Sequence, residues 1–108
     1  MFLKANEQGY APAVPGIRLK TLVHGDQTLM AEFRLAKGHQ LPAHRHPHEQ
    51  TGYLVKGQLQ LRIGADLHDV RPGDSWCIPG GVEHSAEIIE DSVAIEVFSP
   101  VREDYLPK

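Results

Sequence analysis

The sequence has few of the features that stabilise secreted proteins or anchor a chain in a membrane. Its 108 residues include one cysteine, Cys77, so no internal disulfide can form, and a reducing compartment is expected. No apolar run at its start is long enough for a signal peptide or a spanning helix. We therefore expect a soluble, cytoplasmic protein. Cys77, between Trp76 and Ile78, is expected to be a buried structural thiol rather than a catalytic one.

A strong charge of either sign is also missing. The chain has 11 basic and 14 acidic residues, which give a net charge of -3. These charges are interspersed, so there is no basic stripe to neutralise phosphates and no charge run to bind a membrane surface. The expected partner is therefore a small molecule, not nucleic acid or a membrane.

Sustained helical periodicity is absent as well, and short apolar segments separated by turns take its place. The expected strands are residues 17–23, 29–35, 50–56, 59–63, 67–71, 75–78, 84–89 and 93–99. Many short strands at even spacing predict an all-β protein that closes as a sandwich or barrel. A chain of this length forms one domain. Residues 1–16, rich in proline and glycine, are expected to be an irregular arm that precedes a barrel domain of residues 17–108.

Chemistry is concentrated in residues 38–57, which hold four of the seven histidines. His44 and His46 are two apart, so in an extended strand both imidazoles project from one face, where they can bind a single divalent metal. Gln50 can return its amide oxygen to this face as a third ligand. His84, which follows a short apolar strand and a tight turn, is expected to be the fourth ligand. The alternative for an isolated His-x-His segment is a solvated loop without a metal.

The other histidines are less suited to metal binding. His48 shares the parity of the proposed ligands, but Pro47 interrupts the strand, so we expect His48 to lie behind the ligands or at the surface. His39 and His68 are interpreted as structural, and His24 as a solvated residue of a hairpin turn.

Three imidazoles and one amide add no negative charge to a bound ion, which would keep about its full +2. Such an ion binds anions well and polarises carbonyl or hydroxyl oxygens, which is Lewis-acid chemistry. Nickel, zinc, manganese and iron all accept this ligand set, so the sequence predicts one divalent transition metal without identifying it.

The last expected strand has two different faces. Residues 93, 95 and 97 form an apolar face, and Ala94, Glu96 and Phe98 form the other. If the second face points into the barrel, Glu96 is a partly desolvated acid that can move protons, and Arg102 can bind a substrate carboxylate. The alternative is that Glu96 faces solvent while Arg102 pairs with Glu103 or Asp104 at the surface.

Two segments resemble the paired motifs of the cupin superfamily. The first motif is matched by Gly38, His44, His46, Gln50 and Gly57, with Gln50 in place of the family's glutamate. The second is matched by Gly73, Pro79, Gly81 and His84, with Ile88 in place of the family's asparagine. The resemblance implies a single-domain cupin, a jelly-roll-like double-stranded β-helix barrel, with a metal at His44, His46, Gln50 and His84.

Residues 16–106 further resemble the small KdgF-type cupins of pectin and alginate breakdown. The likeness is carried by His-Pro-His-Glu-Gln at residues 46–50 and by Phe-Ser-Pro-Val-Arg-Glu-Asp-Tyr-Leu at residues 98–106. Members of that group convert 4,5-unsaturated monouronates, left by polysaccharide lyases, to the linear keto form. The resemblance implies that Phe98 and Arg102 contact the substrate, and Glu96 stands where the family has a catalytic aspartate.

The first hypothesis is therefore a metal-dependent ring opening and ketonisation of an unsaturated uronate. The metal would bind ring oxygens, Arg102 the carboxylate and Phe98 the sugar, while Glu96 would move a proton. A metal-dependent dioxygenase of small molecules and a non-catalytic module that binds a sugar acid or a metal are the alternatives. Resemblance to cupins also implies a homodimer formed through the sheets, for which the apolar face of residues 93, 95 and 97 is available.

Overall fold

The computed structural model describes residues 1–106, in which eight strands and one short 3₁₀ helix occur. The strands are β1 (Ala11–Val14), β2 (Ile17–His24), β3 (Leu29–Leu35), β4 (Gln40–His44), β5 (Glu49–Ile63), β6 (Asp66–Val70), β7 (Ser75–Ile78) and β8 (His84–Ser99), and the helix is η1 (Glu103–Tyr105). The prediction of an all-β protein is confirmed. No helix in the described part of the chain is long and apolar enough to cross a membrane.

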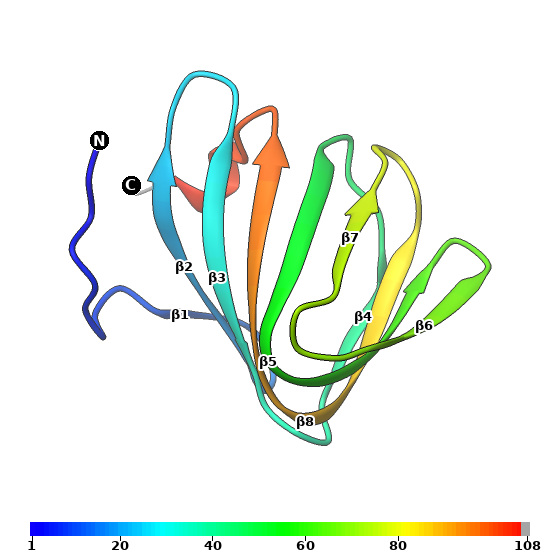
Figure 1. Ribbon diagram of the computed structural model, residues 1–108. Coiled ribbons are helices and arrows are strands. Elements are labelled where there is room, and N and C mark those ends of the chain that lie inside the picture. Colours follow the sequence, from blue (N-terminus) through cyan, green and yellow to red (C-terminus); the bar gives the residue numbers. More distant parts are fainter. Residues whose placement is uncertain (107–108) are drawn as a thin grey trace.

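Two long strands, β5 and β8, belong to both layers of the fold. Residues 49–56 of β5 and 92–99 of β8 form one sheet with β1, β2, β3 and β7. Residues 58–63 of β5 and 84–90 of β8 form the other with β4 and β6. Figure 1 shows the two layers joined at the bottom, where β5 and β8 bend, and splayed apart at the top. Residues of both layers line a cavity between them.

The bend explains why each long strand looks like two strands in the sequence. Gly57 has a positive φ of 100°, and a Cβ at this position would lie 2.1 Å from Oγ of Ser92. Only glycine fits both the conformation and the close approach. Ser92 Oγ accepts a hydrogen bond from the Gln58 amide at 3.0 Å and donates one to the Glu90 carbonyl at 2.7 Å. The glycine that predicted a break therefore marks a bend within one continuous strand, at which the pairing with β8 shifts register.

The first 16 residues include a strand, although they were expected to be irregular. Residues 11–14 form β1, which pairs with the outer edge of β2. Before it, the Tyr10 hydroxyl donates to Glu32 on β3, and the buried Lys20 Nζ donates to both the backbone oxygen and Oδ1 of Asn6. The N-terminal segment is thus fixed along an edge that would otherwise present unpaired backbone groups.

The strands alternate between the interior and the outer surface, as the period of two requires. A buried apolar cluster lies on the inner faces and consists of Ile17, Leu35, Leu54, Leu59, Leu61, Val70, Ala86, Ile88 and Ala94. The prediction that Cys77 is buried is wrong, because this residue is exposed. Trp76 and Ile78 turn inward on β7, so the residue between them turns outward, and Cys77 pairs with Thr51 on the outer face.

Candidate functional site

Three of the predicted metal ligands come together at one end of the interior. His44 ends β4 and pairs across the sheet with His84, the first residue of β8. His46 follows in the loop after β4, so the extended strand that was expected to carry both residues ends at His44. One ring nitrogen from each histidine can be chosen so that all three lie within 4.8 Å of one another. These nitrogens can converge on a single ion.

Each of the three imidazoles is oriented by a backbone carbonyl two residues away. Nδ1 lies 2.8 Å from the Pro42 oxygen in His44, 3.0 Å from the His48 oxygen in His46, and 2.9 Å from the Val82 oxygen in His84. Because a carbonyl only accepts hydrogen bonds, Nδ1 carries the hydrogen in all three rings, and Nε2 presents its lone pair. This arrangement is the one that fixes the tautomer and the ring plane of metal-binding histidines.

Burial favours the neutral, metal-binding form of two of these rings, those of His46 and His84. It lowers the pKa of His46, with a further contribution from the nearby charge of Arg102. It also lowers the pKa of His84, whose Nε2 is buried and has no hydrogen-bond partner within residues 1–106. A divalent cation would satisfy this nitrogen, so the donor set fits the predicted metal.

Gln50 lies beside the three histidines on β5. Its Oε1 is 3.0 Å from Nε2 of His46, the nitrogen that presents a lone pair when Nδ1 donates to a carbonyl. Two lone pairs that face each other are stabilised by a cation between them, and the neutral amide is suited to be the fourth ligand.

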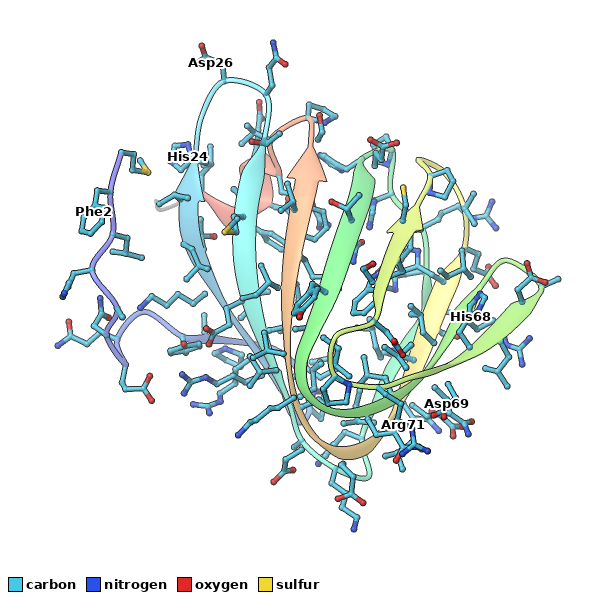
Figure 2. All side chains as sticks on the ribbon, in the orientation of Figure 1. Phe2, His24, Asp26, His68, Asp69 and Arg71 are labelled. Atoms are coloured by element: carbon cyan, nitrogen blue, oxygen red, sulfur yellow. The ribbon has the colours of Figure 1, made fainter. Side chains whose placement is uncertain are left out.

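The remaining histidines are not part of the converging group. His48 lies behind it: its backbone carbonyl contacts Nδ1 of His46, and its ring packs edge-on against that of His46, with 5.7 Å between ring centres. The ring of His39 packs against Gly16, where a Cβ would lie 2.1 Å from it. Figure 2 shows His24 at the end of β2 and His68 on β6, near Asp69 and Arg71.

Glu96 points into the space between the layers, and its side chain is the main acid of the site. The residue is only 7% exposed, so the alternative in which it faces solvent is wrong. Burial raises the pKa of Glu96 to about 8, although the nearby side chains of Gln50 and Trp76 favour the charged form. The Oε2 atom has no hydrogen-bond partner in the described part of the chain. An acid with this pKa holds its proton near neutral pH and can release it to a suitable acceptor.

A glycine between Glu96 and Trp76 brings these two side chains onto one surface. Gly52 on β5 pairs with Glu96 on one side and with Trp76 on the other. The indole of Trp76 packs directly on Gly52: a Cβ at this position would lie 2.2 Å from the ring, so only glycine leaves room for it. The indole Nε1 is buried and lacks a hydrogen-bond partner within residues 1–106. This role of Trp76 was not predicted, because only the strand register places it beside Glu96.

Arg102 follows β8. The sequence left open whether it faces the cavity or pairs with a neighbouring acid, and the structure shows both. Its side chain is only 13% exposed and lines the cavity, yet it also pairs with Asp104, with Nη2 at 2.7 Å from Oδ2. The guanidinium carbon lies 5.0 Å from the ring centre of Phe98 and 4.2 Å from that of Tyr105. Arg102 therefore places a positive charge at the edge of the site.

These groups surround one cavity of about 290 Å³ between the two layers. Its polar lining consists of His44, His46, Gln50, Trp76, His84, Glu96, Arg102 and Tyr105, and apolar residues such as Leu41, Ile78 and Phe98 complete the wall. The volume is at the lower end of the range of about 300–1,000 Å³ for ligand pockets, which suits a small molecule rather than a polymer.

The comparisons with known proteins agree with this architecture. A family model described as "Cupin domain" matches residues 31–99, which is more than half of the chain. The chain belongs to the cupin family. This cupin is 30% identical over 93 residues to the pectin degradation protein KdgF of Dickeya dadantii (strain 3937), and the match covers 84% of each chain.

Two solved structures share the whole fold of this cupin. The structure of KdgF from Halomonas sp. has a TM-score of 0.92 at 30% identity and covers 98% of this chain and 100% of its own. An RmlC-like cupin from Shewanella frigidimarina NCIMB 400 has a TM-score of 0.91 at 25% identity, with 97% and 95% covered. The resemblance to KdgF-type cupins that the motifs predicted is therefore confirmed.

One departure from the cupin motifs has a structural explanation. Ile88, which stands in place of the second motif's asparagine, is 3% exposed and belongs to the apolar cluster. Its backbone oxygen accepts a hydrogen bond from Gly38, and its amide donates to the His39 carbonyl. The backbone of Ile88 thus fixes the segment that precedes β4, while its side chain packs in the core.

Proposed function

We propose that this cupin converts 4,5-unsaturated monouronates to their linear keto form by ring opening and ketonisation. The observation that carries the proposal is the convergence of a neutral metal-ligand set, a buried acid and an arginine on one small cavity. The similarity to a protein named for pectin degradation supports a uronate as the substrate.

His44, His46, Gln50 and His84 would hold one divalent transition metal, for which nickel, zinc, manganese and iron are the candidates. When bound, the ion would act as a Lewis acid toward the oxygens of the sugar, with a charge that its neutral ligands leave at about +2. Backbone carbonyls orient the three imidazoles, and Gln50 lies on β5, so the ligands would orient the sugar without rearrangement.

Arg102 would bind the carboxylate of the uronate. Charge-assisted pairs between a guanidinium and a carboxylate are strong and directional, and they strengthen where water is excluded. The low exposure of Arg102 supports this role, and Phe98, which lines the cavity beneath the guanidinium, would pack against the sugar. The binding of a monomer, not a polymer, is consistent with the size of the cavity.

Glu96 would move the proton that the reaction requires. Ring opening releases the proton of the anomeric hydroxyl, and ketonisation adds a proton to the vinyl carbon. A single carboxyl group between these positions can give one proton and recover the other, so it is unchanged at the end of the cycle. Burial of Glu96 beside Gly52 excludes water from the carboxyl group. Glutamate carries the same acidic group as the aspartate found at this position in the family, on a side chain longer by one methylene.

The test is the decay of a freshly generated 4,5-unsaturated galacturonate, followed by proton NMR with the protein loaded in parallel with each of the four metals. Faster loss of the vinyl signal than in a protein-free blank is expected, and His84→Ala should abolish the acceleration. If no loaded form exceeds the blank, the proposal is wrong. Oxygen uptake by the iron form would then favour a dioxygenase, and tight binding without turnover would favour a binding module.

We also propose that two copies pair through the outer face of the larger sheet. Tyr53 is 50% exposed there and lies opposite Ile95, while Met30 is exposed and lies opposite Val97. Sedimentation should detect a dimer that Tyr53→Glu weakens, whereas Leu67→Glu, at an exposed apolar residue of β6, should leave it intact. A cytoplasmic location remains a prediction from the single cysteine.

A further inference from the structure

Arg102 is held from outside the cavity by an acidic residue of the following turn. Its Nε donates to Oδ1 of Asp104 at 2.9 Å, and its Nη2 donates to Oδ2 at 2.7 Å. We propose that Asp104 is a positioning residue, which aims the guanidinium of Arg102 into the cavity so that its other edge binds the substrate carboxylate. This inference rests on the proposed function, in which Arg102 binds that carboxylate.

The hydrogen-bond pattern leaves one edge of the Arg102 guanidinium available. A guanidinium has five N–H groups in a planar fork, and the pair with Asp104 uses two of them on the Nε side. Within residues 1–106, the side-chain hydrogen bonds drawn from Arg102 involve Nε and Nη2, and none involves Nη1. The N–H groups at the Nη1 end can therefore donate to a second carboxylate while Asp104 stays bound.

The turn that carries Asp104 is firmly attached to the barrel. Asp104 and Tyr105 both lie in η1. Oγ1 of Thr21, on β2, donates a hydrogen bond to the backbone oxygen of Tyr105 at 2.6 Å. The Tyr105 ring packs edge-on against Phe98 at 5.4 Å between ring centres. The guanidinium carbon of Arg102 lies within 5.0 Å of both ring centres, so the two rings confine the group while Asp104 holds its Nε side.

Electrostatics alone predicts the opposite effect, which makes the proposal decidable. The side chain of Asp104 is 57% exposed, and that of Arg102 is 13% exposed. If Asp104 only neutralised Arg102, its removal would make the cavity more positive and would lower the KM for an anion. If Asp104 positions Arg102, its removal frees a long side chain that must be ordered again on binding, and the KM rises.

The experiment compares Asp104→Ala, Asp104→Glu and Glu103→Ala with wild type, using 4,5-unsaturated galacturonate and the metal that gives the fastest turnover. Glu103 is the matched control, because it lies in the same turn and its loss changes the charge equally, while its side chain makes no ion pair within residues 1–106. We expect Asp104→Ala to raise KM about three- to tenfold with little change in kcat, since ordering one flexible side chain costs this much in affinity. Asp104→Glu should recover part of the loss, and Glu103→Ala should behave as wild type.

A second measurement does not depend on turnover. The Nε–H signal of Arg102 in a proton–nitrogen NMR spectrum, assigned by its absence in Arg102→Lys, should be resolved in wild type and Glu103→Ala and lost in Asp104→Ala. An unchanged or lower KM in Asp104→Ala overturns the positioning role. If wild type does not turn over the uronate, the proposed function fails, and the NMR signal alone then decides: its persistence in Asp104→Ala overturns the role, and its loss supports it.

Discussion

Replacing Glu96 by glutamine tests the buried acid in the free protein, apart from any activity. Glu96 is 7% exposed, and burial raises the pKa of its carboxyl group from an ordinary 4.5 to about 8. The folded state therefore binds this proton more tightly than the unfolded chain. The contribution of Glu96 to stability is greatest below pH 4.5, is lost as the pH rises from 4.5 to about 8, and is constant above that range.

The magnitude follows from the size of the shift. A rise from 4.5 to about 8 is roughly 3.5 units, which at about 1.36 kcal/mol per unit amounts to about 5 kcal/mol. Glutamine has nearly the same shape and does not titrate, so the free energy of unfolding of Glu96→Gln should not fall in this way as the pH rises. The variant should be close to wild type in free energy of unfolding at pH 5 and several kcal/mol more stable at pH 9. The other titrating groups contribute to both proteins and cancel in the difference.

Urea unfolding of the metal-free protein at pH 5, 7 and 9 measures this difference. Trp76, the single tryptophan, lies in the same cavity as Glu96 and reports the transition by fluorescence. A difference between Glu96→Gln and wild type that stays constant from pH 5 to 9 would refute the reasoning. Saturating divalent metal should reduce the pH dependence in wild type, because a nearby cation stabilises the carboxylate.

Three further predictions concern the site. His84→Ala should weaken divalent metal binding, measured by calorimetry. Removing a residue that only hydrogen-bonds to a metal ligand costs roughly 10–100-fold in affinity, and removing the ligand itself should cost more. Gly52→Ala should lower the free energy of unfolding by about 1–3 kcal/mol and shift the Trp76 fluorescence, because the new methyl group would lie 2.2 Å from the indole. Gly25→Ala is the control, because a Cβ at Gly25 would have no heavy atom within 4 Å apart from its chain neighbours. Arg102→Ala should raise the KM for an anionic sugar at least about tenfold, and unchanged kinetics would remove its role as the carboxylate ligand.

The fold could be predicted because strand alternation is a local signal, and the histidine cluster could be predicted because the spacing of its residues matches the cupin motifs. Strand alternation has a period of two, and the spacing between His44 and His46 and the turn before His84 are read directly from the chain. The continuity of β5 could not be predicted, because a glycine with positive φ is the signal of both a hairpin turn and a bend. At Gly57 the choice depends on Ser92, which lies 35 residues away in sequence and bonds the bent backbone.

The direction of a side chain at the site depends on strand pairing in the same way. Glu96 was equally compatible with the interior and with solvent until its neighbours were known, and Cys77 was placed on the wrong face of β7. The contact between Trp76 and Gly52 requires the register of two strands that are separated by a loop and another strand. No local pattern contains this information, since a glycine opposite a tryptophan has a meaning only after they are paired.

The distribution of unsatisfied polar atoms connects the fold to the proposed function. Within residues 1–106, four buried side-chain nitrogen or oxygen atoms lack a hydrogen-bond partner, and three of them belong to His84, Trp76 and Glu96, which line the same cavity. Buried polar atoms are nearly always paired in folded proteins, because each unpaired one costs about 1–3 kcal/mol. A barrel that left these three atoms unpaired for structural reasons alone would be more stable with apolar residues there. Their concentration around the His cluster fits the proposed function, in which a metal and a polar ligand would complete the coordination and hydrogen bonding of these atoms.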